Sequence, residues 1–201
     1  MSQFDFDPDK IEEAVGHGPT VVSYPHTRIS NVLEAIVDAF GRFFSWSWII
    51  LLALVVANVF LRYFFDTTFV ALEELQWHLY SIGFMIALSY AVVKDGHVRV
   101  DVLAEQLSAR KRAWIELLGM MLLLAPFCVL ILIYAYPFVE RSYLINEVSG
   151  APGGLPMRWL IKSVILVGFS LLLMSAVARA LRALSLLTGF PKAIPAGKRR
   201  G

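Results

Sequence analysis

The chain has 201 residues, of which 58% are hydrophobic and 17% charged, and its mean hydropathy is +0.65. Soluble domains average about half apolar and a quarter charged residues, so this composition excludes an ordinary soluble enzyme and predicts a single membrane domain. The net charge of +2 is too small to indicate a nucleic-acid partner, and the single cysteine, Cys128, excludes a disulfide framework.

The amino-terminal part carries two different patterns. Residues 1–27 are polar and bear several acidic side chains, which predicts disorder. Residues 28–42 repeat apolar side chains at helical spacing, with polar residues such as Glu34 and Asp38 on the opposite face. We therefore expect an amphipathic helix that lies on the membrane surface and leads into the first span.

Four stretches without charged side chains follow, of 19, 19, 23 and 16 residues. Nineteen helical residues cover about 28 Å, close to the hydrocarbon core of about 30 Å. The shortest stretch lengthens if Lys162 and Arg179 extend their side chains outward. All five tryptophans lie near an end of a stretch, at the depth of the lipid headgroups. The sequence thus predicts an all-α integral membrane protein with four transmembrane helices in a domain of residues 43–187, with spans at about 43–63, 75–94, 115–139 and 159–182, followed by a basic tail, residues 188–201.

The distribution of basic residues predicts the orientation of the spans. Fourteen Lys and Arg residues lie in the amino-terminal segment, the 94–116 loop and the carboxy-terminal tail, against four in the other two connections. Connections rich in Lys and Arg stay in the cytoplasm. We therefore expect both termini and the 94–116 loop to be cytoplasmic.

The spans themselves offer few polar groups for an ion or substrate path, because each charge at a helix centre costs about 2.5–3.5 kcal/mol. The exceptions gather at the predicted external ends of the first two spans. Arg62 is placed to pair with Glu73 or Glu74, and Glu74 lies one helical turn before His78. Two interpretations remain open: a structural tie between helix ends, which we favour, and a proton or ion site made by Glu74 and His78.

No pattern for a cofactor, a metal or a catalytic group is apparent in the sequence. A bis-histidine haem site needs two imidazoles at one depth inside the bundle, whereas His78 and His97 fall near opposite faces of the membrane. Zinc-ligand spacings, phosphate loops and nucleophile–base arrangements are also missing from the sequence. We therefore expect no cofactor and no enzymatic activity.

Two motifs and their spacing carry a family resemblance. The run Glu73-Glu74-Leu75, a whole span, and then Asp95-Gly96-His97-Val98-Arg99-Val100-Asp101 resembles the small membrane subunit of TRAP (tripartite ATP-independent periplasmic) transporters. Arg62-Tyr63 and the stretch from Gly153 to Lys162 also fit, so the resemblance runs from about Phe43 to Leu187. The chain departs from it at residues 76–78, where many members place an arginine, and at Ser175, where a glutamine is common.

The resemblance implies an accessory subunit in a bacterial inner membrane. Members pack against a large polytopic subunit that imports a solute, commonly an organic acid, with an ion gradient, and a periplasmic solute-binding protein docks transiently. It implies no catalytic, cofactor or metal residues here. Structural or interface candidates are Arg62, Glu73, Glu74 and His78 outside, His97, Arg99 and Asp101 in the cytoplasmic turn, and Arg158 and Lys162 at the entry to the last span.

Two other functions remain open from the sequence. The first is a small transporter or channel that works alone as an oligomer, with Glu74 and His78 lining a path. The second is a haem-binding membrane anchor of a redox chain. The accessory role differs from both because it predicts that the isolated chain is unstable or inert. It also requires a much larger membrane protein as a partner, while membrane lipid surrounds the rest of the chain.

Overall fold

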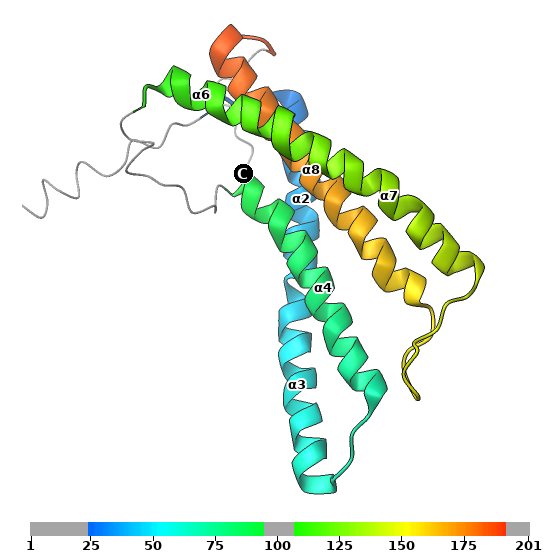
Figure 1. The fold of residues 1–201 in the computed structure, drawn as a ribbon. Helices are drawn as coiled ribbons and strands as arrows, with labels where there is room; N and C mark the ends of the chain where they lie inside the picture. The colour runs from blue at the N-terminus through cyan, green and yellow to red at the C-terminus, as the bar shows by residue number, and fades with distance from the viewer. Residues whose placement is uncertain (1–23, 95–106, 192–201) are drawn as a thin grey trace, which may run out of the picture.

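The computed structural model describes residues 24–94 and 107–191, and every regular element within these two ranges is a helix. The all-helical prediction is thus confirmed for the described part of the chain. Figure 1 shows the elements, which in chain order are α2 (Arg28–Phe44), α3 (Trp46–Phe65), α4 (Val70–Val93), α6 (Ala109–Leu118), the π-helical segment η1 (Gly119–Leu124), α7 (Ala125–Leu144) and α8 (Arg158–Thr188).

Three helical stretches in the described residues are long and apolar enough to cross a membrane. They are Arg28–Phe65, Arg110–Leu144 and Arg158–Thr188. Helix α4 is 24 residues long, but it is less apolar than these three. Its first turns carry four polar or charged residues: Glu73, Glu74, Gln76 and His78.

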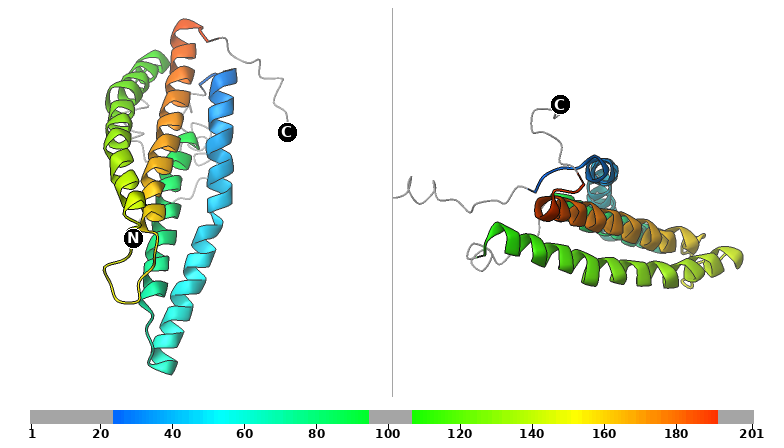
Figure 2. Two further views of the ribbon diagram at one scale, coloured as in Figure 1. Left: turned by 90° about the vertical axis from the view of Figure 1, so that its right-hand side faces the viewer. Right: turned by 90° about the horizontal axis from the view of Figure 1, so that it is seen from above.

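Helices α2 and α3 lie almost in line, with Ser45 as the joint between them (Figure 2). A reciprocal capping box between Thr27 and Ser30 starts α2. The predicted amphipathic helix therefore exists, but its acidic residues face the protein. Glu34 pairs with Arg182 of α8, and Asp38 pairs with Lys94 at the end of α4. The apolar residues Ile29, Val32, Ile36 and Phe40 are exposed instead.

Helix α8 is the centre of the bundle, because α2, α4, α6 and α7 all pack on it (Figure 1). Small residues allow this close approach. Gly168 faces Met85 of α4, and the Ser175 hydroxyl donates a hydrogen bond to the Ser89 carbonyl at 3.1 Å. Larger buried side chains fill the space beside them, in clusters around Val37, Ile86 and Leu171 and around Val92, Cys128 and Leu172.

The α3–α4 pair and the α7–α8 pair meet at one end of the bundle and diverge toward the other (Figure 1). We call the end that holds Tyr24 and Arg182 the network end. The opposite end, which holds the connection between α7 and α8 (residues 145–157), is called the loop end. Two long hairpins that share one packed end need a separate contact to fix their other ends.

The helix from Ala109 to Leu144 changes its hydrogen-bonding pattern just before a proline. Pro126 has no N–H, and its ring would collide with the carbonyl oxygen of Leu122 in a regular α-helix. The π-helical segment η1 ends at Leu124, directly before this point. The kink that Pro126 predicts is therefore accompanied by a local widening of the helix.

Candidate functional site

Ionisable side chains in the described helices gather at two levels. Seventeen positions separate Lys162, at the loop end, from Arg179, at the network end. At 1.5 Å per residue this is about 26 Å, which matches the hydrocarbon core of a bilayer. No Asp, Glu, Lys or Arg lies between the two levels in α3, α4, α7 or α8. The charged side chains of these helices are therefore confined to two layers at the helix ends.

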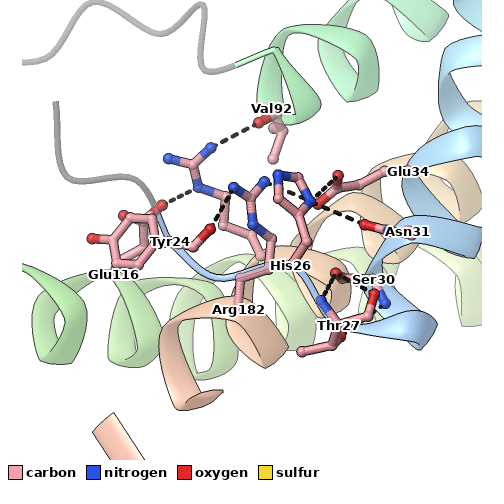
Figure 3. A network of polar contacts seen from close by, with 10 residues as sticks. Tyr24, His26, Thr27, Ser30, Asn31, Glu34, Val92, Glu116 and Arg182 are labelled. Atoms are coloured by element: carbon pink, nitrogen blue, oxygen red, sulfur yellow. Dashed lines mark hydrogen bonds and ion pairs between the residues drawn. The ribbon is translucent and has the colours of Figure 1, made fainter. Parts of the chain in front are cut away.

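The network end contains a buried ion pair between Arg179 of α8 and Glu116 of α6 (Figure 3). The two side chains are only 6% and 11% exposed. The Arg179 guanidinium also donates to the Val92 carbonyl at the end of α4, at 3.3 Å. One cation thus joins three helices, and its charge is compensated inside the chain.

A second arginine at the network end anchors the segment that leads into α2 (Figure 3). Arg182 contacts Glu34 at 3.1 Å and donates to the Tyr24 carbonyl at 3.0 Å. His26 lies against the same carboxylate, at 3.5 Å, and against the Asn31 amide oxygen, at 3.0 Å. These contacts hold residues 24–27 across the end of α8.

At the loop end, one carboxylate organises the connection between α7 and α8. Glu74 of α4 accepts a hydrogen bond from the Ser149 hydroxyl and another from the Leu155 backbone N–H. The loop also closes on itself, since Ser149 N–H donates to the Leu155 carbonyl at 3.1 Å. A side chain at Gly154 would collide with Ser149 and come within 2.9 Å of the Glu74 carboxylate. Glu74 therefore supplies the contact that joins the two diverging hairpins.

A second carboxylate in the loop pairs with the start of α8. Glu147 contacts the Lys162 ammonium, which also lies 4.1 Å from the centre of the Phe138 ring. The Arg158 backbone N–H donates to the Glu147 carbonyl at 2.9 Å. Lys162 is therefore held between α7 and the loop, and it does not extend freely outward as the sequence suggested.

Hydrogen bonds lower the pKa of both carboxylates that hold the loop, Glu74 of α4 and Glu147 of the loop itself. The Ser149 hydroxyl, and secondarily the Leu155 N–H, hold the pKa of Glu74 below its ordinary 4.5. The Lys162 ammonium is the main cause that lowers the pKa of Glu147. Because the folded loop favours the ionised forms, this stabilisation is complete above about pH 4.5 and is lost as the pH falls through the lowered pKa values.

We expect Glu74→Gln to free the loop at every pH. The amide can still accept one hydrogen bond, but it loses the charge-assisted pair. A nitroxide attached at the exposed position Pro152 should be immobile at neutral pH in the parent chain and become mobile as the pH falls through the lowered pKa of Glu74. In the Glu74→Gln chain it should be mobile throughout. Equal nitroxide mobility in both chains at pH 7 would contradict the anchoring role.

Not all of the predicted site residues come together. Arg62 and Glu73 are exposed, and no ion pair joins either of them to a described residue, so the predicted Arg62 tie is not formed. His78 points its ring Nδ1 at the backbone carbonyl of Glu74, not at the carboxylate. The predicted tie at Glu74 exists, but its partner is the 145–157 loop. His97, Arg99 and Asp101 lie outside the described residues.

Sequence reasoning missed the network end. From the sequence, Arg179 is expected to extend outward, Arg182 enters only the count of basic residues, and Glu116 is not considered. Their partners lie 63 and 148 positions away in the chain, so no local spacing links them. The only usable signal was that charges flanked neighbouring spans at the same predicted depth.

The fold and its two charged layers define a membrane-embedded helical protein. Residues 51–186 match the model of a family described as Tripartite ATP-independent periplasmic transporters, DctQ component. The match covers about two thirds of the chain, and the chain belongs to this family. The resemblance read from the motifs is thereby confirmed: the protein is a small membrane component of a TRAP transporter. Comparisons with curated proteins and with solved structures find no match.

Proposed function

We propose that the chain spans a bacterial inner membrane four times, with both termini in the cytoplasm. Helix α4 is one of the four spans in this arrangement, in addition to the three apolar stretches, and it is the second in chain order. Glu74 and Val92, which lie at the two charged levels, are 18 positions apart on α4 and so about 27 Å apart. The network end is then cytoplasmic and the loop end periplasmic, in agreement with the distribution of Lys and Arg.

Its role is to brace a large transport subunit that imports a solute, an organic acid, with an ion gradient. The observation that carries this role is that the buried and half-buried charged groups at the two levels have partners within the described chain. Arg179 is paired with Glu116, Lys162 with Glu147, and Glu74 with the loop. Groups that are paired in this way fix helices and are not themselves available to bind a solute or carry an ion.

The outer surfaces of α3, η1 and α7 support a packing role. Leu52, Leu123 and Ile133 are 65%, 73% and 63% exposed in the chain alone. Apolar side chains at this depth are covered by lipid or by the helices of a partner. The 145–157 loop is held by Glu74 and is followed by the exposed Arg158 at the start of α8. It faces the side on which a periplasmic binding protein docks.

Uptake by cells tests the proposed role. Removal of this chain and removal of the large subunit should abolish uptake of the same solutes, and the chain alone should restore none. Glu74→Gln should reduce uptake only as far as it weakens assembly. Uptake by the chain alone, lost in a normally assembled Glu74→Gln variant, would establish instead a transporter that works by itself.

Charge reversal at Arg158 without effect on uptake would count against a contact between the loop and the binding protein.

A further inference from the structure

We propose that the joint between α2 and α3 forms, together with α4, a binding site for one anionic phospholipid of the cytoplasmic leaflet. The inference rests on the four-span placement proposed above and not on the accessory role. One cavity of about 270 Å³ lies between α4 and α8, and another of about 180 Å³ lies at the joint between α2 and α3. Of these two, only the cavity at the joint combines an apolar interior with exposed cations at its mouth.

The cavity at the joint is an apolar groove that runs along α4. Its walls are the side chains of Phe44, Trp48, Ile86, Ala87 and Tyr90. Tyr90 and Gly83 mark its two ends and are seven positions apart, which corresponds to about 10 Å along the helix. The groove therefore extends from the cytoplasmic level into the hydrocarbon layer, where the upper part of an acyl chain lies.

Two glycines determine the shape of this groove. A Cβ at Gly41 would lie 2.2 Å from the Tyr90 ring, and one at Gly83 would lie 2.9 Å from the Ser47 hydroxyl. The helices thus touch above and below the groove, while the turn at Ser45 separates α2 from α3 between these contacts. The groove is a consequence of how this chain packs, and it opens at the side of the bundle where Trp48 is 41% exposed.

Charge complementarity identifies the occupant. Arg42 lines the mouth of the groove, and Lys94 lies beside it, because both pair with a single carboxylate, Asp38, at 3.1 Å and 2.6 Å. The Lys94 ammonium also lies 5.3 Å from the centre of the Tyr90 ring, which lines the groove. The arginine and lysine side chains are 73% and 50% exposed, so the mouth has a net charge of +1 and free hydrogen-bond donors. A phosphodiester with an acyl chain beneath it matches this arrangement, as in other basic pockets on the cytoplasmic side.

The complex purified in mild detergent can be titrated with phosphatidylglycerol and with phosphatidylcholine, and the bound lipid counted by native mass spectrometry. We expect preferential binding of one phosphatidylglycerol. The double variant Arg42→Gln/Lys94→Gln should lower its affinity by about 25-fold, because each cation near the surface contributes about fivefold. The matched control Arg110→Gln/Lys111→Gln removes the same charge from exposed positions of α6 and should leave binding unchanged.

Two further arms separate this site from general attraction to a charged surface. Ala87→Phe should fill the groove and abolish binding of phosphatidylglycerol without changing the charge of the protein. Ala53→Phe, on the exposed face of α3, should leave phosphatidylglycerol binding unchanged. An excess of inorganic phosphate should fail to displace the lipid, since the acyl chain supplies part of the affinity. Equal losses in both charge variants, unchanged binding in Ala87→Phe, or displacement by phosphate would each overturn the proposal.

The test is independent of the accessory role. Lipid can be counted on the chain whether or not a large subunit purifies with it. If Arg42→Gln/Lys94→Gln or Ala87→Phe loses the lipid but still purifies with the large subunit, the result supports the lipid site and leaves the accessory role intact. Loss of the large subunit in Ala87→Phe, with no phosphatidylglycerol bound to the parent complex, would show that the groove is a protein contact and would overturn the lipid site.

Discussion

Replacement of Arg179 by methionine should destabilise the protein by about 3–5 kcal/mol, the largest effect that we expect from a single substitution. The substitution leaves the Glu116 carboxylate at 11% exposure without its guanidinium. It also removes the hydrogen bond to the Val92 carbonyl, which ties α4 to α8. The stability can be measured by unfolding with sodium dodecyl sulfate in mixed micelles.

Two companion variants separate the buried charge from other effects of the substitution. The double variant Arg179→Met/Glu116→Leu removes both charges and should recover most of the lost stability, because the cost lies mainly in the buried carboxylate that has lost its guanidinium. Arg42→Met breaks a pair whose arginine is 73% exposed and should change stability by less than about 1 kcal/mol. A double variant as unstable as the single one would contradict this account.

Gly168→Val should destabilise the protein by about 1–3 kcal/mol, since it forces α8 away from α4. A Cβ at this position would lie 2.9 Å from the Cβ of Met85, which cannot move aside as the end of a flexible side chain could. The separation would also disturb the hydrogen bond from Ser175 to the Ser89 carbonyl. The same unfolding assay measures the loss.

Gly119→Val is the matched control, because a Cβ at Gly119 meets nothing within 4 Å. Both substitutions place the same β-branched residue in a helix, so the difference between them isolates the contact with Met85. The Gly119 variant should keep close to the parent stability. Equal destabilisation of the two variants would show that helix propensity, and not the approach of α4 to α8, sets the cost.

Much of the fold could be predicted because its signals are local. Charge-free runs of about 19 residues indicate helices of membrane length from composition alone. Pro126 marked the place at which the third helix changes its hydrogen bonding, although only the structure shows the π-helical segment before it. The helix at Arg28–Phe44 was expected from its periodicity. Its orientation was not, because the cations that attract Glu34 and Asp38 come from α8 and the end of α4.

The contacts of the two charged layers were harder to predict. The short connection between the first two spans suggested that Glu74 could reach Arg62, and helical spacing suggested that it could reach His78. Its carboxylate reaches instead Ser149 and Leu155, 75 and 81 positions away. A single sequence does not determine which acid pairs with which base, because the partners lie on different helices and meet only when the helices pack. The structure therefore pairs Glu74 with the 145–157 loop and not with Arg62, and the pair of Arg179 with Glu116 was missed.

Co-purification from the native membrane is the most direct test of the accessory role. The tagged chain, extracted in mild detergent, is purified beside the Glu74→Gln variant, and the proteins recovered with each are identified and quantified by mass spectrometry. We predict that a large polytopic membrane protein accompanies the parent chain in about equal amount. Recovery of the parent chain by itself, as a stable oligomer, would contradict the account and make Glu74 and His78 the first residues to examine as a transport path.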